Sequence, residues 1–295
     1  MTELSHPDRV YFPGAEITKA DYADYLETVC ETMLPYVAER PLSLVRCPGG
    51  VEKACFFQKH HMKGMPEGFK PVKIEEKSGD KEPYVYIDDL EGLRGCAQFG
   101  ALELHPWGAR IGDIEHPERI IFDLDPDEGL DFSDVKAAAN DIKDLLESAG
   151  LAAFPMLTGG KGVHVIAPLK PKADWDGVKT FCRGLARALA DNQPDRYVAE
   201  MSKAKRKGRV FIDWLRNQRG QTSVAPFSVR ARKGAPVAAP ITWDELSDAK
   251  SGAEYDIRTL PRRLAAQKSD PWARYEAAAE TLSDGAIDWA AKAGG

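Results

Sequence analysis

The sequence predicts a mixed α+β fold, and three observations support this prediction. A helical hydrophobic pattern covers residues 18–40, short apolar segments bounded by turn residues fill residues 42–104, and strand and helix patterns alternate from Arg119 onward. The 295 residues are 43% hydrophobic, which suffices for one large domain or two closely packed ones. The sequence shows neither an internal repeat nor a linker-like segment.

The first predicted element is a helix over residues 18–40. Thr18 has the character of an N-cap, with Asp21 three residues later, and Pro41 disfavours helix beyond Arg40. A segment rich in glycine, proline and charge, residues 63–80, predicts a mobile loop. The apolar segments around it predict strands at Leu42–Arg46, Cys55–Gln58, Tyr84–Ile87 and Gln98–Leu104.

Strand and helix patterns alternate in the second part of the chain. A helix capped at Ser133 and stopped at Gly150 is expected after the first of these strands, and a second helix is expected over residues 176–191. After about residue 240 the sequence predicts short helices, beginning with the capping box Thr242…Glu245. The expected strands are 119–124, 151–157, 163–167 and 209–213.

Composition excludes several classes of protein. The sequence lacks an apolar run of membrane-helix length and a hydrophobic N-terminal signal, so a cytoplasmic protein without membrane contact is predicted. Its five cysteines are odd in number, scattered and without a Cys-x-x-Cys pair, which speaks against a disulfide framework and a structural zinc site.

Positive charge is concentrated in one segment although the net charge is −6. Between Lys203 and Lys233 lie ten basic residues and a single acid, Asp213, and such a stripe suits phosphate binding. For residues 203–209 alone, a solvated surface loop is the favoured interpretation. Arg230 and Arg232 alternate along a predicted strand and are expected to share a face.

Two carboxylates end the apolar run Ile120-Ile121-Phe122. Asp123 and Asp125 project from the same side of an extended strand, and Pro126 follows, so the pair is well placed to hold hard divalent cations. Solvated acids or helix-capping acids are the plain alternative. An EF-hand loop is excluded, because its sixth and twelfth positions would be Glu128 and Asp134. An aspartyl-phosphate phosphatase remains a weak alternative.

Further candidates lie at the ends of other predicted strands. Asp213 ends Val210-Phe211-Ile212, and three carboxylates with Asp123 and Asp125 suit two Mg²⁺ or Mn²⁺ ions about 4 Å apart, an arrangement used in phosphoryl transfer. Thr158-Gly-Gly-Lys161-Gly-Val-His164 combines a hydroxyl, a cationic glycine turn and a histidine, which suits a nucleoside triphosphate. It is not a Walker A loop, because Gly162 follows Lys161.

Along the chain, the segments Phe122–Pro126, Thr158–His164 and Phe211–Trp214 resemble the three motifs of the archaeo-eukaryotic primase superfamily. More closely, the chain resembles the polymerase domain of bacterial DNA ligase D, an end-joining repair enzyme. The resemblance extends over about residues 6–250, and further matching segments are Arg9–Pro13, Phe56–His60, Leu102–His105 and Gln221–Arg232.

The resemblance implies a fold and an activity. The expected fold is α+β, with a primase-like (RRM-like) catalytic core of mixed and antiparallel sheets flanked by helices and an N-terminal α/β module packed on it. One domain over residues 1–295 is expected: a module at about 1–115, the core at 116–240 and C-terminal helices at 241–295. The expected activity is template-directed addition of nucleotides, preferably ribonucleotides, to a primer 3′-OH at gaps and double-strand breaks.

The resemblance also assigns roles to residues. Two divalent metal ions, Mn²⁺ or Mg²⁺, are expected on the catalytic Asp123, Asp125 and Asp213. The incoming nucleotide is expected to contact His105, Thr158, Lys161, His164, Arg230 and Arg232. Arg9 and Lys19 stand where the family binds the DNA 5′-phosphate, with arginine replacing the usual lysine at the first position, and Lys59 matches a lysine near the active site. Core packing is the preferred interpretation of Phe56, Phe57 and Phe227, and base stacking is the alternative.

Partners follow from the same resemblance. They are DNA with a gap or a broken end carrying a 5′-phosphate, ribo- or deoxyribonucleoside triphosphates, and additionally a Ku protein and a DNA ligase, in a cytoplasmic, nucleoid-associated setting. A catalytically weak module that binds and aligns DNA ends through the 5′-phosphate is the alternative from another class.

Overall fold

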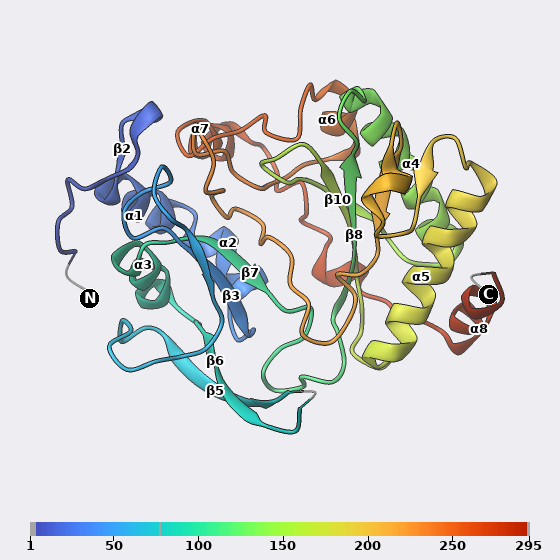
Figure 1. Ribbon diagram of the computed structural model, residues 1–295, viewed down its shortest axis with the longest axis horizontal. Coiled ribbons are helices and arrows are strands. Elements are labelled where there is room, and N and C mark those ends of the chain that lie inside the picture. Colours follow the sequence, from blue (N-terminus) through green and yellow to red (C-terminus); the bar gives the residue numbers. More distant parts are fainter. Residues whose placement is uncertain (1–3, 77, 294–295) are drawn as a thin grey trace. The chain divides into compact units, whose positions relative to one another are not determined.

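The computed structural model describes residues 4–76 and 78–293. The chain forms two compact units, and neither is continuous in sequence (Figure 1). Unit 1 combines the chain up to Gly112 with residues 222–239 and 255–267. Unit 2 is built from residues 113–221, 240–254 and 268 onward. Both units combine sheets with helices, so the prediction of a mixed α+β fold is confirmed.

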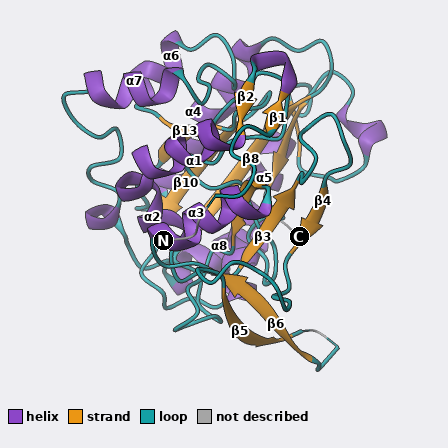
Figure 2. Cartoon of the chain, turned by 90° about the vertical axis from the view of Figure 1, so that its left-hand side faces the viewer, coloured by secondary structure: helices purple, strands orange, loops and turns teal. Residues whose placement is uncertain are grey.

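Unit 1 contains a five-stranded sheet in the order β4-β3-β6-β5, with β7 pairing to β3. Strands β5 and β6 form an antiparallel ribbon (Figure 2). The strands of unit 1 are β1 (Val10–Phe12), β2 (Ile17–Thr18), β3 (Leu42–Arg46), β4 (Phe56–Gln58), β5 (Lys70–Glu75), β6 (Lys81–Tyr86) and β7 (Ala101–Pro106). Its helices are η1 (Pro13–Ala15), α1 (Lys19–Thr28), α2 (Cys30–Val37), α3 (Leu90–Phe99) and α7 (Thr259–Ala266).

The predicted first helix is two helices. The Thr18–Asp21 capping box is present, but at Val29 the backbone leaves helical values (φ −95°, ψ 4°) and separates α1 from α2. Two other expectations are wrong. Strand β5 lies within the predicted loop 63–80, since pairing with β6 gives its backbone a partner. Residues 98–99 end a helix, α3, instead of beginning a strand.

The sequence pattern did not predict α3, because two glycines weaken the helical signal of this segment. Asp89 caps it by accepting the Gly92 N–H at 2.9 Å, and Gly100 ends it in the left-handed region (φ 69°). A Cβ atom on Gly92 would lie 2.5 Å from the Ile87 Cβ. The glycine therefore permits close tertiary packing that outweighs its poor helix propensity.

One disulfide bond departs from the expectation for the cysteines. Cys47 and Cys55 are joined, with their Cα atoms 4.4 Å apart. Their separation of eight residues closes a short loop, which brings the two thiols together although the spacing is not that of a familiar motif. Closing the loop limits the freedom of the unfolded chain, and loops of this size contribute roughly 2 kcal/mol of stability in the chain-entropy model.

Unit 2 contains a six-stranded sheet in the order β11-β12-β8-β10-β9-β13. Helix α4 packs on β8 and β10, α5 packs on β8 and β11, and α8 packs on α5. The strands are β8 (Arg119–Pro126), β9 (Phe154–Leu157), β10 (Val163–Pro168), β11 (Tyr197–Val198), β12 (Val210–Asp213) and β13 (Ala239–Pro240). The helices are α4 (Phe132–Ser148), α5 (Trp175–Asn192), η2 (Lys203–Arg206), α6 (Trp243–Asp248), η3 (Glu276–Ala278) and α8 (Asp284–Ala293).

Predictions for unit 2 are mostly confirmed, with small shifts at element ends. The Thr242–Glu245 capping box begins α6 as expected. The N-cap of α4 is Asp131 and not Ser133, because the Asp131 N–H is satisfied by the Asp134 side chain at 3.0 Å. Residues 203–209 are mostly exposed, as the loop interpretation predicts. Within the described part of the chain, no helix is long and apolar enough to cross a membrane.

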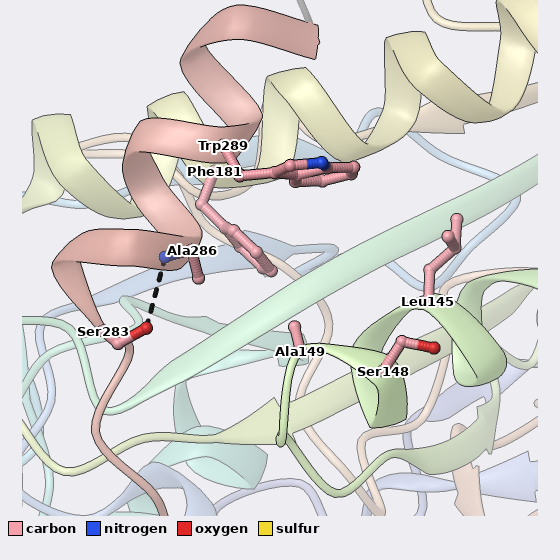
Figure 3. A pocket seen from close by; sticks show the side chains of 7 residues that line it. All are labelled: Leu145, Ser148, Ala149, Phe181, Ser283, Ala286 and Trp289. Atoms are coloured by element: carbon pink, nitrogen blue, oxygen red, sulfur yellow. Dashed lines mark hydrogen bonds between the residues drawn. The ribbon is translucent and has the colours of Figure 1, made fainter.

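Helices α4, α5 and α8 line an apolar pocket of about 390 Å³ that is open to solvent (Figure 3). The rings of Phe181 and Trp289 and the side chain of Leu145 line it, one from each helix, and Trp289 is half-exposed. Among the described residues that line this pocket, none belongs to the predicted site.

Candidate active site

Strand register brings the predicted catalytic residues of unit 2 together. Asp123 on β8 lies opposite Asp213 on β12 and opposite His164 on β10. Residues directly opposite one another on antiparallel strands project from the same face of a sheet. His164, Asp123 and Asp213 therefore form one row across three strands. Asp125, two residues further along β8, adds a third carboxylate on the same face.

The row is largely buried. His164 and Asp213 are 2% and 5% exposed. His164 Nε2 lies 3.3 Å from Asp123 Oδ1, while its Nδ1 has no hydrogen-bond partner among the residues that the structure describes. Buried polar atoms are nearly always paired, so this nitrogen is available to a ligand.

Arg216 is a further residue of this site, although in the sequence it is only one of the ten basic residues between Lys203 and Lys233. Its Nη2 atom lies 3.1 Å from Asp213 Oδ2 and 3.4 Å from Asp123 Oδ2. One guanidinium nitrogen thus contacts carboxylates from two strands. A cation three residues after a strand-ending aspartate was the only available signal, and it does not reveal that the chain turns back.

Asn217 explains why the chain turns back after β12. Its Oδ1 accepts the Ile121 N–H at 2.8 Å, and its Nδ2 donates to the Ile121 carbonyl at 2.7 Å. The side-chain amide therefore takes the place of the next peptide group of β12 in the pairing with β8. The turn between Asp213 and Asn217 is fixed at both ends, and Arg216 is held over the carboxylates.

Burial and mutual repulsion perturb the carboxylates. Burial, then the charge of Asp123, raises the pKa of Asp125 from 3.8 to about 6. Burial also raises the pKa of Asp213, although the charge of Arg216 opposes the shift. For Arg216, burial lowers the pKa, but the three carboxylates outweigh burial and the net shift is upward. The site is short of positive charge.

Asp125→Asn is expected to stabilise the protein at pH 8 in a chelating buffer by on the order of 2 kcal/mol. The folded pKa of about 6 exceeds the usual 3.8, so the folded state binds more protons and the unfolding free energy falls as the pH rises through this window. The neutral amide removes this loss. Chemical denaturation at several pH values measures it, with the exposed Glu128→Gln as control. A difference that is equal at pH 3.5 and pH 8 would contradict the expectation.

The chemistry of these donors suits a hard divalent cation. Carboxylate oxygens are the preferred ligands of Mg²⁺ and Mn²⁺. After burial, the charge of Asp123 contributes most to the raised pKa of Asp125, and a bound cation would relieve that repulsion. Within residues 4–76 and 78–293, however, no three His, Cys, Asp or Glu side chains are gathered closely enough to form a ready-made metal site. Metal ligation by Asp123, Asp125 and Asp213 therefore remains a proposal.

The glycine turn between β9 and β10 lies against the carboxylate strand. A Cβ atom on Gly162 would lie 2.4 Å from the Leu124 carbonyl and 3.4 Å from Asp125 Oδ1. The Thr158 hydroxyl donates to the Gly162 carbonyl at 2.9 Å, so it closes the turn. Lys161 is exposed at the turn.

Gly252 supports this turn from outside and was not anticipated. Its carbonyl accepts the Gly159 N–H at 2.8 Å. A Cβ atom at Gly252 would lie 2.5 Å from the Gly162 carbonyl and 2.8 Å from that of Gly160. The two backbones are in direct contact, so only glycine fits here without moving the turn.

In unit 1, Glu103 organises two other predicted nucleotide-binding residues. Its Oε2 lies 2.8 Å from His105 Nε2 and accepts Arg230 Nε–H at 3.1 Å, and its Oε1 accepts the Ala231 N–H at 2.8 Å. Burial raises the pKa of Glu103, but the His105 hydrogen bond and the Arg230 charge outweigh burial and hold it at about 2. The only sequence signal for Glu103 was its position on the same strand face as His105.

Arg230 and Arg232 do not share a strand face, contrary to the expectation. The chain turns sharply, because the Arg232 N–H donates to the Arg230 carbonyl at 2.7 Å. Arg230 is directed to the buried Glu103, whereas Arg232 is exposed. A nucleotide contact by Arg232 remains a prediction.

Arg9 and Lys19 lie side by side in unit 1, as a shared phosphate site requires. The Lys19 N–H donates to the Arg9 carbonyl at 2.8 Å. Lys19 is only 2% exposed, and its ammonium donates to the Ser5 carbonyl and to Gln98 Oε1, both at 2.7 Å. Burial lowers the pKa of Lys19, and the charge of Arg9 lowers it further. Arg9 is exposed and donates to the Pro48 carbonyl at 3.1 Å.

Two aromatic residues on β4 are exposed, so core packing is wrong for them. Phe56 and Phe57 are 45% and 71% exposed, whereas Phe227 is buried as expected. The Phe57 ring lies 6.2 Å from the His105 ring. Lys59, just beyond this strand, donates to Glu76 Oε1 at 2.8 Å and to the Tyr84 hydroxyl at 3.3 Å.

Comparisons with known proteins agree with this architecture. The family model of the LigD primase-polymerase domain matches residues 18–272. The multifunctional non-homologous end joining protein LigD of Pseudomonas aeruginosa is 36% identical over 281 residues, which are 95% of this chain and 33% of that protein. The bifunctional non-homologous end joining protein LigD of Bacillus subtilis is 28% identical over 88% of this chain and 42% of that protein.

A solved structure is also similar. The polymerase domain from Mycobacterium tuberculosis ligase D in complex with DNA has a TM-score of 0.87 and 32% identity, covering 95% of this chain and 99% of that one. The chain spans about a third of the length of the Pseudomonas LigD relative.

The protein is thus a nucleotidyltransferase of the primase-polymerase class. The chain belongs to the LigD primase-polymerase domain family. The resemblance seen in the sequence is confirmed, and the aspartyl-phosphate phosphatase alternative finds no support.

Proposed function

We propose that this chain adds nucleotides, preferentially ribonucleotides, to a primer 3′-OH in a template-directed, divalent-metal-dependent reaction at DNA gaps and double-strand breaks. The observation that carries the proposal is the row of His164, Asp123 and Asp213 across three paired strands. Family membership supplies the reaction class. The name of the Pseudomonas aeruginosa relative supports a role in non-homologous end joining, and a Ku protein and a DNA ligase are proposed as further partners.

Asp123, Asp125 and Asp213 would hold two Mn²⁺ or Mg²⁺ ions, which neutralise charge on the attacking and leaving oxygens of phosphoryl transfer. Such a reaction depends on positioning and on electrostatics, so a covalent nucleophile is not required. The rigid β8–β12 pairing and the Asn217 amide supply that positioning. Their role is to keep two carboxylates at a constant separation.

The incoming triphosphate would lie at the turn of residues 158–162, where the exposed Lys161 offers positive charge. His164, whose buried Nδ1 has no hydrogen-bond partner within residues 4–76 and 78–293, would contact the nucleotide from the same side as the carboxylates. In unit 1, Glu103 fixes His105 and Arg230, which would meet the sugar and the phosphates. Thr158 would act mainly through the shape of the turn.

A DNA end would be bound by Arg9 and Lys19 of unit 1 through its 5′-phosphate. Arg9 suits this role because it is exposed and its guanidinium can contact phosphate with two nitrogens. Lys19, which is buried beside Arg9, would add positive charge to this site. Exposed Phe56 and Phe57 would stack against unpaired bases, since aromatic platforms bind single strands in this way.

Gly252→Ala is expected to raise the KM for the nucleotide roughly tenfold, since overpacking costs about 1–3 kcal/mol and here displaces the turn. Steady-state incorporation at varied nucleotide concentration measures it. Gly285→Ala is the control, because the nearest atom to its added Cβ is 4.0 Å away. An unchanged KM in a folded Gly252→Ala protein would contradict the assigned role of the turn.

Primer extension on a gapped duplex tests the proposed function. The duplex carries a 5′-phosphate or a 5′-hydroxyl beyond the gap, and ribo- and deoxyribonucleotides are each supplied with Mn²⁺ or Mg²⁺. Template-dependent incorporation favouring ribonucleotides and the phosphorylated end is expected. Arg9→Ala should remove the preference for the phosphate but leave incorporation. Failure to incorporate any nucleotide with either metal would overturn the proposal.

A second candidate is a module that aligns DNA ends without catalysis. It is favoured by one observation: Arg9, Lys19, Phe56 and Phe57 all belong to unit 1, which lacks the three carboxylates. In that case the chain would bind 5′-phosphorylated gapped DNA more tightly than hydroxyl ends, and Asp123→Asn would change nothing measurable. Binding and incorporation assays on the same substrates separate the two candidates.

A further inference from the structure

Arg216 stands between the two strands that carry the proposed metal ligands. Its Nη2 is within 3.4 Å of carboxylate oxygens of both Asp123 and Asp213. A nitrogen that touches both carboxylates takes up the space in which an ion shared by them would bind. The guanidinium is thus an internal cation at the centre of the carboxylate group.

The attachment of this guanidinium is incomplete. Arginine frequently pairs with a carboxylate through two parallel hydrogen bonds. Here a single nitrogen serves two carboxylates, and the buried Nε has no hydrogen-bond partner among the described residues. The side chain remains 34% exposed, so it has an open path away from the carboxylates. The guanidinium is therefore held mainly by electrostatic attraction to the carboxylates and less by directional hydrogen bonds.

We propose that Arg216 is a built-in counter-cation that competes with the divalent metal for Asp123 and Asp213. It offsets carboxylate repulsion in the metal-free protein, and its Nη2 leaves the shared position when a metal ion binds. Arg216 therefore sets the metal affinity of the site and acts as a positioning residue. This inference rests on the proposed function, because that proposal makes the carboxylates metal ligands.

Two opposite effects of neutralising Arg216 follow. Without the guanidinium, a divalent ion meets three carboxylates and no competing cation, so it binds more tightly. In a chelator, the same change leaves the carboxylate repulsion uncompensated, so the folded state is less stable. If Arg216 only shaped the turn or only contacted the substrate, its neutralisation would not increase the metal affinity.

Mn²⁺ titration of the full chain without nucleotide or DNA tests the inference. Calorimetry, or electron paramagnetic resonance of free Mn²⁺, gives the dissociation constant. Arg216→Gln is expected to bind Mn²⁺ about tenfold more tightly than the wild type. In the presence of a chelator this variant should melt at a lower temperature than the wild type. Added Mn²⁺ should raise its melting temperature by more than it raises that of the wild type. The matched control is Arg219→Gln, which loses an ion pair with Glu115 and should keep the wild-type affinity.

The outcomes separate this inference from the proposed function. If Asp123→Asn retains wild-type Mn²⁺ affinity, the metal site lies elsewhere and the proposed function fails with it. If Asp123→Asn weakens binding but Arg216→Gln binds Mn²⁺ as the wild type does or more weakly, only the inference about Arg216 is overturned. Arg216→Lys, which keeps one positive charge, should give an affinity near the wild type, and it serves if the glutamine variant does not fold.

Discussion

Asp123→Asn is expected to lower the rate of primer extension by roughly a thousandfold or more while leaving the fold intact. Asp123 is the central residue of the row, with His164 opposite on one side and Asp213 on the other. It also contacts Arg216. Asparagine keeps the shape but loses the charge on which metal binding depends. Removing one of several repelling carboxylates should leave the melting temperature unchanged or higher.

Single-nucleotide incorporation with saturating Mn²⁺ measures the loss, and circular dichroism with thermal melting confirms the fold. The exposed Glu128→Gln, five residues further along the chain, removes a negative charge outside the row and should retain full activity. Robust incorporation by the double variant Asp123→Asn/Asp125→Asn would exclude these carboxylates from the catalytic centre. It would leave the end-binding function as the better account of the chain.

Asn217→Ala is expected to lower the free energy of unfolding by about 3 kcal/mol. Its amide makes two hydrogen bonds to the buried backbone of Ile121 and one to the Trp214 carbonyl at 2.9 Å. Alanine leaves the Ile121 N–H and carbonyl unpaired, and unsatisfied buried groups are costly. The same change loosens the β8–β12 pairing that positions Asp123 and Asp213, so incorporation should also fall.

Urea denaturation measures the stability change. Asn140→Ala is a matched control, because Asn140 is exposed on α4 and its amide makes one bond within the helix, at 2.9 Å to the Lys136 carbonyl. The Asn140→Ala variant should lower the free energy of unfolding by less than about 1 kcal/mol. A loss below 1 kcal/mol for Asn217→Ala would show that the amide does not replace strand pairing.

Local patterns could be predicted from the sequence because their causes lie within a few residues. Capping boxes at Thr18 and Thr242 depend on side chains three residues apart, and they are present. Alternation along a strand made Asp123 and Asp125 share a face, and β8 carries them so. The helix α3 could not be predicted, because its glycines weaken the local signal and its packing on Ile87 is tertiary.

In the site, too, residues within motifs could be identified from the sequence, whereas their partners remote in the chain could not. His105 and Arg230 were identified through motif resemblance, but their common partner Glu103 was not, since 127 residues separate it from Arg230 in sequence. The supporting contact of Gly252 with the nucleotide turn is likewise remote in sequence. Where sequence patterning misled, as for Phe56, Phe57 and the Arg230–Arg232 segment, exposure and turn geometry depended on neighbours that no local pattern specifies.

Local sequence patterns were enough to predict the mixed α+β class, the paired carboxylates of β8, the glycine turn and the family to which these motifs belong. Tertiary structure decided that Asp213 and His164 flank Asp123, that Arg216 bridges two strands, and that Cys47 joins Cys55. The physical reason is the sequence separation over which each interaction acts. Side-chain alternation and helix capping act between near neighbours, whereas strand register and ion pairing depend on how distant segments pack, and no single segment encodes that packing.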